Sequence, residues 1–404
     1  MKRREFIRIG AAAAFLSNFA ASEKRSEKLE AKDRINIGID PRIELYSVVL
    51  YLSDFRGLKN EQGVIEARVV TDLDFSYKRE VERRFSPFKG HGVVNIYSEM
   101  ATRGLFRFGH PPSVMLHLSN PPLLEERIPI DDFLVTMAGS RAKLDEFVQG
   151  MRAFAGDASF MDFFKGHESA YSQLASDYRR NMEWDYVKDL EEYYGYRQDS
   201  YHLILAPLFH PGGFGPRIKT PAGNYQAYAI IGSKGVIEDG PNFGSGDSMR
   251  RLCWHEFSHS FVNHLTDLHL GKLKGPVGAL ESQKLPAQVI ERIKTFGLWD
   301  VHLADQTSEY VVRAATTRLS AIRLGQEKAD QALELEKKAG FSHLDAICEC
   351  LEKYEKQRDK YPTLKDYFPQ IIAVFEKLAA EELVRREPEW PSLSSPETGQ
   401  EESR

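Results

Sequence analysis

Apolar positions follow two different patterns along the chain. Residues 35–39 alternate apolar and polar side chains, as a half-buried strand does. Compact apolar runs at 201–208 and 225–231 predict two further strands, and Gly232 closes the second run. Residues 43–52 are mostly apolar and suit a buried helix. Strands separated by long helical stretches predict an α+β fold built around a mixed sheet.

Helical patterns fill most of the remaining chain. Residues 141–194 predict two helices rich in Phe, Tyr and acid–base pairs. A further helix is expected over about 247–265, and another over about 305–324, where Gly325 stands at the position of a left-handed stop. Residues 326–385 are rich in Ala, Glu, Lys and Leu and predict a helical C-terminal part.

These patterns divide the chain into consecutive parts. The parts are a targeting segment at 1–22, a linker at 23–34, an N-terminal α/β part at 35–200, a central part at 201–325, the helical part at 326–385 and a tail at 386–404. The tail is rich in Pro, Ser and Glu. We expect it to be disordered, because it cannot bury enough apolar surface to offset the entropy of ordering.

The first residues have the pattern of a secretory signal. The pair Arg3-Arg4 precedes Phe6, and a short alanine-rich stretch follows at 9–21. The arginine pair resembles a twin-arginine signal, which predicts an exported, periplasmic or extracellular protein. The alternative is a basic, frayed helix of a cytosolic protein. No later apolar run approaches the roughly 20 residues of a spanning helix, so no integral membrane segment is expected after signal removal.

Charge and cysteine content narrow the class of protein. Charged residues make up 28% of the chain and the formal net charge is −5, so no basic excess is present to neutralise phosphates and no nucleic-acid partner is expected. The three cysteines, Cys253, Cys348 and Cys350, are too few for a disulfide framework. We expect buried or free thiols, with a bridge from Cys253 to one of the other two as the alternative.

One five-residue segment has the spacing of a metal site. In His255-Glu256-Phe257-Ser258-His259 the histidines are four residues apart on an expected helix. That spacing places both imidazoles on one face, about 5–6 Å apart at Cβ, where they can reach one ion. Glu256 would stand beside the ion and take a proton from water, so the segment predicts a catalytic zinc site. The same helix carries an apolar stripe formed by Cys253, Phe257, Phe261 and Leu265. The alternative is two ordinary hydrogen-bonded histidines beside a surface glutamate.

A catalytic zinc usually has three protein ligands, so a third is required. Zincins with a third histidine would need it at position 265, which is Leu265, so this subclass is excluded. The other common solution is a glutamate from a following helix, and Glu309, in the first turn of the helix expected at 305–324, is the best candidate. Glu281 and Glu291 are weaker alternatives. Glu309 could instead be a helix N-terminal acid favoured by the macrodipole.

Two segments carry a resemblance to known proteins. The run His255–Asn263, followed downstream by Glu309–Ala314, resembles the glutamate-zincin metallopeptidases. With the early segment Asp40–Leu45, the chain is more narrowly similar to a bacterial family of exported proteins known as domain of unknown function 4932, over roughly residues 35–325.

The resemblance implies a zincin-like core with a two-histidine active-site helix in the central part, 201–325. It implies zinc as the cofactor, with ligands at His255, His259 and Glu309 and with Glu256 as general base. Well-known glutamate zincins carry an acid four residues after the ligand glutamate, where this chain has Arg313. We therefore expect Arg313 to hold Glu309 or a substrate carboxylate.

The predicted reaction is hydrolysis of a peptide or protein substrate. It needs a donor for the developing oxyanion, and the candidates are Tyr310, His302, Tyr228 and His210. The strand at 225–231, which carries Tyr228, is expected to present an edge to an extended peptide, with a plain core strand as the alternative. Two other functions stay open. One is zinc binding without turnover, acting through a protein partner, and the other is a zinc amidase acting on a non-peptide cell-envelope substrate.

Overall fold

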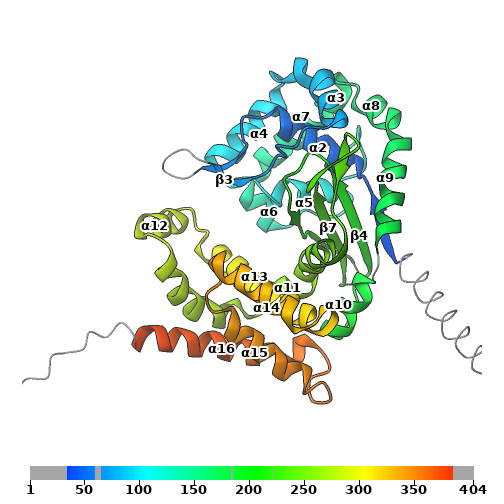
Figure 1. The fold of residues 1–404 in the computed structure, drawn as a ribbon. Coiled ribbons are helices and arrows are strands. Elements are labelled where there is room, and N and C mark those ends of the chain that lie inside the picture. The colour runs from blue at the N-terminus through cyan, green and yellow to red at the C-terminus, as the bar shows by residue number, and fades with distance from the viewer. Residues whose placement is uncertain (1–33, 60–64, 183–184, 222, 385–404) are drawn as a thin grey trace, which may run out of the picture.

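The computed structural model describes residues 34–59, 65–182, 185–221 and 223–384 (Figure 1). The predicted signal segment at 1–22 and the predicted tail at 386–404 lie outside the described residues, as does the linker except for Arg34. Within the described residues, no helix is both long enough and apolar enough to cross a membrane.

A five-stranded mixed sheet lies at the centre of the fold. Its parallel strands are β1 (Ile35–Gly38), β4 (Ser200–Ala206) and β7 (Tyr225–Gly232), which confirms the three predicted strands. The short strands β5 (Gly213–Phe214) and β6 (Arg217–Lys219) both pair antiparallel with the far side of β7. Strand β7 is therefore an interior strand, and the expectation that it presents an edge to a peptide is wrong. The free edge on this side belongs to β5 and β6.

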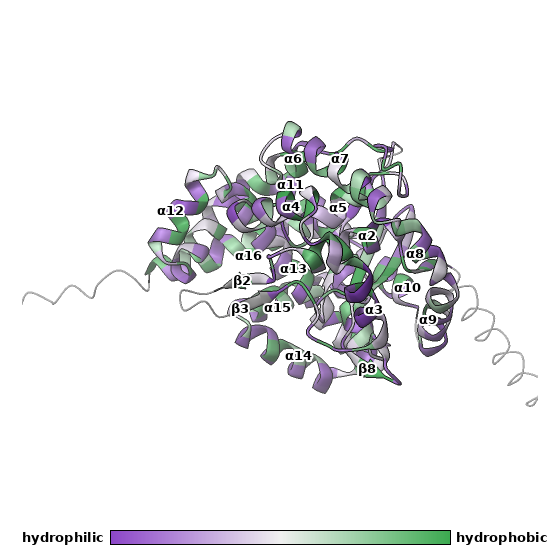
Figure 2. Ribbon diagram, turned by 90° about the horizontal axis from the view of Figure 1, so that it is seen from above, coloured by the Kyte–Doolittle hydropathy of each residue, from purple (hydrophilic) through white to green (hydrophobic). Residues whose placement is uncertain are grey.

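Two hairpins and two layers of helices complete the described structure. The hairpins are β2 (Gly57–Lys59) with β3 (Ile65–Arg68), and β8 (Gly235–Ile237) with β9 (Gly240–Asn242). The first group of helices is α2 (Pro41–Leu52), α3 (Ser76–Phe85), the short 3-10 helix Ser86–Phe88, α4 (Gly92–Arg103), α5 (His110–Leu116), α6 (Asp132–Met137), α7 (Arg141–Asp157) and α8 (Phe160–Gly166). The second group is α9 (Glu168–Asn181), α10 (Tyr186–Tyr194), α11 (Gly246–Lys284), α12 (Ala287–Thr295), α13 (Trp299–Leu324), α14 (Gln326–Lys338), α15 (Leu344–Glu355) and α16 (Leu364–Val384). Peripheral helices such as α12 and α14 alternate polar and apolar stretches along their length (Figure 2).

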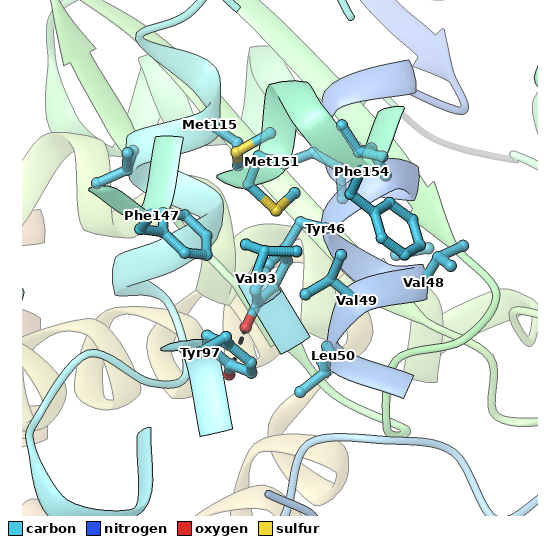
Figure 3. Packing of buried hydrophobic residues seen from close by; sticks show 14 of the residues in the cluster. Tyr46, Val48, Val49, Leu50, Val93, Tyr97, Met115, Phe147, Met151 and Phe154 are labelled. Carbon is cyan, nitrogen blue, oxygen red and sulfur yellow. Dashed lines mark hydrogen bonds between the residues drawn. The ribbon is translucent and has the colours of Figure 1, made fainter. Parts of the chain in front are cut away.

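The sheet separates two hydrophobic cores, because successive strand residues point to opposite faces. On β7, Tyr228 and Ile230 belong to the core that packs with α2, α4, α5 and α7. Ala227, Ala229 and Ile231 belong to the other core, which contains α10, α11 and α13. Figure 3 shows the first core, where the hydroxyls of Tyr46 and Tyr97 form a buried hydrogen bond of 2.8 Å.

The early segment that contributed to the family resemblance is used to start and anchor α2. The Asp40 carboxylate accepts a hydrogen bond from the backbone N–H of Arg42, at 2.9 Å, and so caps the helix. Pro41 occupies the first turn, where its missing N–H costs nothing. The Arg42 guanidinium donates to the carbonyls of Leu116 and Leu118, at 3.1 and 3.0 Å, and fastens α2 to the end of α5.

Several predicted helix boundaries were wrong. Residues 141–194 form four helices, α7 to α10, rather than two, and Ser159, with φ of +47°, separates α7 from α8. Helix α11 continues past Leu265 to Lys284, because Leu273, Val277 and Leu280 are buried as well. Helix α13 begins at Trp299, earlier than the expected start.

The helical C-terminal part is confirmed, and it packs against the rest of the protein. The buried side chains of α15 and α16 join the core that contains α11 and α13. Cys253, Cys348 and Cys350 are all buried and free, so the alternative of a disulfide bridge is wrong.

Candidate metal centre

Helix α11 holds the predicted metal-binding segment rigidly. The side chains of its apolar stripe have no exposed surface, and they are Cys253, Phe257, Phe261 and Leu265. This stripe seats the helix against the sheet and so turns His255 and His259 toward a cleft on the other side. Among the described residues, donor atoms of His255, Glu256 and His259 lie within 4.8 Å of one another.

Helix α13 brings Glu309 to the same point. The Nε2 atoms of His255 and His259 are 3.4 Å apart, and the nearest Glu309 oxygens lie 3.7 Å from His255 and 3.5 Å from His259. Ligand atoms that lie about 2.0–2.1 Å from a tetrahedral zinc ion are roughly 3.3–3.4 Å from each other. The three groups therefore have a spacing and a chemistry that fit a zinc ion.

The electrostatics of the three groups also suit a cation. Burial alone would raise the pKa of Glu309, but His255, His259 and Arg313 together outweigh burial and lower that pKa to about 2. Burial lowers the pKa of His255 to about 3, with further lowering by His259 and Arg313, although Glu309 opposes it. A carboxylate anion and a neutral imidazole are the protonation states that bind a metal.

Arg313 forms an ion pair with the Glu309 carboxylate. Its Nε donates to Glu309 Oε2 at 2.9 Å, and its Nη1 pairs with Glu336 on α14. The guanidinium also stacks on the Phe341 ring, 4.2 Å from its centroid. Of the two roles expected for Arg313, the structure shows the contact with Glu309. Because Glu336 comes from the C-terminal helices, that part of the chain helps to position the site.

His259 has a partner for its other nitrogen. Its Nδ1 lies 3.0 Å from the side-chain amide of Asn263, one turn later on α11. The amide orientation that satisfies all its neighbours has the Asn263 nitrogen donating to His259 Nδ1 and to the His259 carbonyl oxygen, while the amide oxygen accepts from Arg217. A ligand role for Nε2 would leave the proton on Nδ1, and the amide would then turn so that its oxygen accepts the hydrogen bond from Nδ1. This contact orients the ring toward Glu309.

Glu256 lines the cleft and is buried beneath Gly213 and Gly215. Its side chain is 4% exposed, and burial and the neighbouring Glu309 raise its pKa well above the ordinary value. A Cβ at Gly213 would lie 2.6 Å from Glu256 Oε1, and one at Gly215 would lie 2.2 Å from the Glu256 carbonyl oxygen. Only glycine allows β5 to cross the metal helix this closely.

Two predicted oxyanion donors do not lie at the metal centre. Tyr310 is 1% exposed, and its hydroxyl accepts a hydrogen bond from Lys284 at 2.6 Å in the core behind α13. It follows Glu309 directly, so the helix turns its side chain to a different face. His302 pairs with Glu281 at 3.2 Å and stacks on Trp299. The structure therefore does not bring Tyr310 or His302 to the candidate site.

The other two predicted donors are also misplaced. Tyr228 lies on the sheet face opposite α11, where it stacks on His202 and its hydroxyl donates to Gln226. The structure therefore does not bring it to the cleft, either as an oxyanion donor or as a substrate-binding residue. His210 packs against Phe214 and is not among the described residues that line the cleft. The weaker third-ligand candidates lie elsewhere, since Glu281 binds Lys284 and His302, and Glu291 pairs with Lys294.

The cleft that contains the metal centre has a volume of about 1000 Å³. Figure 1 shows the elements that bound it, with α5 and α6 on one side and α11 and α13 on the other. Strand β5 also lines it, as do Leu335 and Glu336 of α14. Sequence reasoning missed several lining residues, namely Gly213, Arg251, Lys234, Asp305 and His110. Of these, only Arg251 and Asp305 could have been predicted from the sequence. Each stands four residues before a predicted ligand and so lies on the same helix face as that ligand.

Comparison with known proteins places the chain in a family. The model of the family described as "Domain of unknown function (DUF4932)" matches residues 35–374, and the chain belongs to this family. The match extends beyond the central part through α14 and α15 and into α16. Searches of curated proteins and of solved structures found no significant match.

Proposed function

We propose that the protein is an exported zinc metallopeptidase with a zincin-like core. The observation that carries the proposal is the convergence of two histidines from α11 and one glutamate from α13, 3.4–3.7 Å apart, beside a buried second glutamate. The resemblance of both segments to glutamate zincins supports the same assignment. The predicted signal segment supports export.

His255, His259 and Glu309 would hold the zinc ion. When bound there, zinc supplies Lewis-acid chemistry, because it polarises a carbonyl oxygen and acidifies water. Glu256 accepts a proton from water on its carboxylate and then donates that proton to the amine that leaves the cleaved bond. Its burial under Gly213 excludes bulk water from the carboxylate and keeps the proton affinity of that group high.

The free edge of β5 and β6 supports a peptide as substrate. Strand β5 pairs with β7 on one side only, which leaves its other backbone edge beside the cleft. An extended peptide can add to such an edge through backbone hydrogen bonds, with little dependence on its side chains. The edge assigned to 225–231 from the sequence is thus replaced by one formed at residues 213–219.

The proposal is tested on the full chain reconstituted with zinc. Bound zinc is measured by elemental analysis, and turnover is measured with unfolded casein and with internally quenched peptides. We expect Glu256→Gln to keep its zinc while cleavage falls by about 10²–10⁴-fold, because the proton acceptor is lost. We expect Glu309→Ala to lose zinc, while the exposed control Glu349→Gln on α15 keeps both properties.

Each part of the proposal can fail separately. A zinc-loaded wild-type protein that cleaves no peptide would rule out the peptidase. Cleavage of a cell-envelope amide instead would identify the amidase alternative. Unchanged zinc content in Glu309→Ala would exclude that residue as a ligand.

A further inference from the structure

The two ends of the cleft carry different sets of charged side chains. Asp267 and Asp305 line the end beyond His259, and Arg251 and Lys234 line the end before His255. Helix α11 presents Arg251, His255, His259, Asn263 and Asp267 at four-residue intervals, so one helical face runs from a cation through the metal centre to an acid. Asp267 is paired at 2.6 Å with Arg217, which also lines the cleft, so the acidic end has a counter-ion.

The cationic end lacks a counter-ion. Within the described part of the chain, Arg251 makes no hydrogen bond or ion pair. Lys234 donates to Ser248, at 2.8 Å to Oγ and 3.3 Å to the carbonyl oxygen, and has no carboxylate partner there. Asp247, one turn before Arg251 on α11, is paired with Lys328, and Glu336, which also lines the cleft, is paired with Arg313.

The two cations act on each other. Burial lowers the pKa of Lys234, and Arg251 lowers it further, whereas Cys253 opposes the change. Holding two like charges together in a partly desolvated cleft costs free energy unless an anion joins them. Thr317 of α13 also lines the cleft and can donate to an anionic ligand, whereas the neighbouring hydroxyls of Thr316 and Ser320 already donate to backbone carbonyls of α13.

We propose that Arg251 and Lys234 bind a carboxylate of the substrate and so determine its specificity. This inference rests on the proposed function only in taking the substrate to be a peptide. Arg251 precedes His255 by one helical turn, a rise of about 6 Å. An extended peptide advances about 3.3 Å per residue, so the carboxylate would lie about two residues from the bond that is cleaved. It belongs either to a free C-terminus or to an acidic side chain, since both present the same group.

Binding is measured by fluorescence anisotropy with the zinc-loaded Glu256→Gln protein, in which turnover is removed. The probes are one labelled neutral hexapeptide with a free carboxylate, the same peptide amidated, and an amidated version that carries Glu near its C-terminus. A charge-assisted pair predicts that the free acid binds about 10- to 100-fold more tightly than the amide. Adding Arg251→Gln should reduce that ratio to near one.

A matched control removes a cation from the same helix outside the cleft. Lys272→Gln should leave the ratio of acid to amide affinity unchanged, since Lys272 is exposed and does not line the cleft. Lys234→Gln is the second test variant, used with a circular-dichroism check in case Arg251→Gln fails to fold. Tight binding of the Glu-containing amide identifies an acidic side chain as the source, and its weak binding identifies the C-terminus.

Equal affinity for all three peptides would overturn the inference, as would equal weakening of all three by Arg251→Gln. The result is separate from the test of turnover. If wild-type protein cleaves nothing but the Arg251-dependent ratio is found, the peptidase proposal fails and the carboxylate site stands. If peptides are cleaved but no acid preference is found, the peptidase proposal stands and the carboxylate site fails.

Discussion

A buried carboxyl group far from the metal centre makes the stability of this protein depend on pH. Glu44 on α2 is 1% exposed, and its Oε1 accepts a hydrogen bond of 2.5 Å from the Tyr77 hydroxyl. Its Oε2 has no hydrogen-bond partner among the described residues. Burial raises the pKa of Glu44 to about 7, although the Tyr77 hydroxyl and the charge of His167 oppose the shift.

The sign and size of the effect follow from this shift. The folded protein holds the proton up to about pH 7, while the unfolded chain releases it near the usual value of 4.5. Stability contributed by this group is therefore present below pH 4.5 and is lost as the pH rises through 7. A pKa that is about 2.5 higher in the folded than in the unfolded protein corresponds to about 3 kcal/mol of unfolding free energy.

Glu44→Gln removes this titration and keeps an oxygen for Tyr77. The free energy of unfolding of wild type and variant is measured by urea titration with circular dichroism at pH 4, 6 and 8, in the presence of a chelator so that metal binding does not contribute. The advantage of the variant should grow by about 3 kcal/mol between pH 4 and pH 8. A change below about 1 kcal/mol over that range would refute the reasoning, because Glu44 would then titrate at its ordinary pKa.

Three further outcomes are expected. Arg313→Gln should weaken zinc binding by about 10- to 100-fold in a chelator competition, because Glu309 loses the group that orients it. Gly213→Ala should abolish peptide cleavage while zinc is retained, because the added Cβ collides with the Glu256 carboxylate at 2.6 Å. Arg3→Lys with Arg4→Lys should block export of the folded protein, as measured by cell fractionation.

Each of these outcomes has its own control. Arg318→Gln changes another arginine of α13, which pairs with Glu355 of α15, and should leave zinc affinity unchanged. Gly271→Ala, where no atom lies within 4 Å of the added Cβ, should keep peptide cleavage. Wild-type affinity in Arg313→Gln, full turnover in Gly213→Ala, or continued export of the double lysine variant would contradict the corresponding prediction.

Expectations that depend on one helix or strand agree with the structure more closely than those that need two. The four-residue spacing of His255 and His259 and the apolar stripe of α11 follow from helix geometry, and both are found. Tyr310 illustrates the limit. It is adjacent to Glu309 in sequence, yet the turn of α13 directs it to Lys284 in the core. Tyr228 was misplaced because strand alternation identifies two faces but does not say which one the metal helix covers.

Sequence by itself determined the α+β class, the existence of three strands, the helical C-terminal part and the five-residue segment on α11. These depend on periodicity and on contacts between near neighbours in the chain. Only the tertiary structure decided that β7 lies inside the sheet, that Gly213 covers Glu256, and that Lys234 joins Arg251 at one end of the cleft. These juxtapositions join residues from different elements. Their positions depend on how the helices and the sheet pack, which local patterns do not specify.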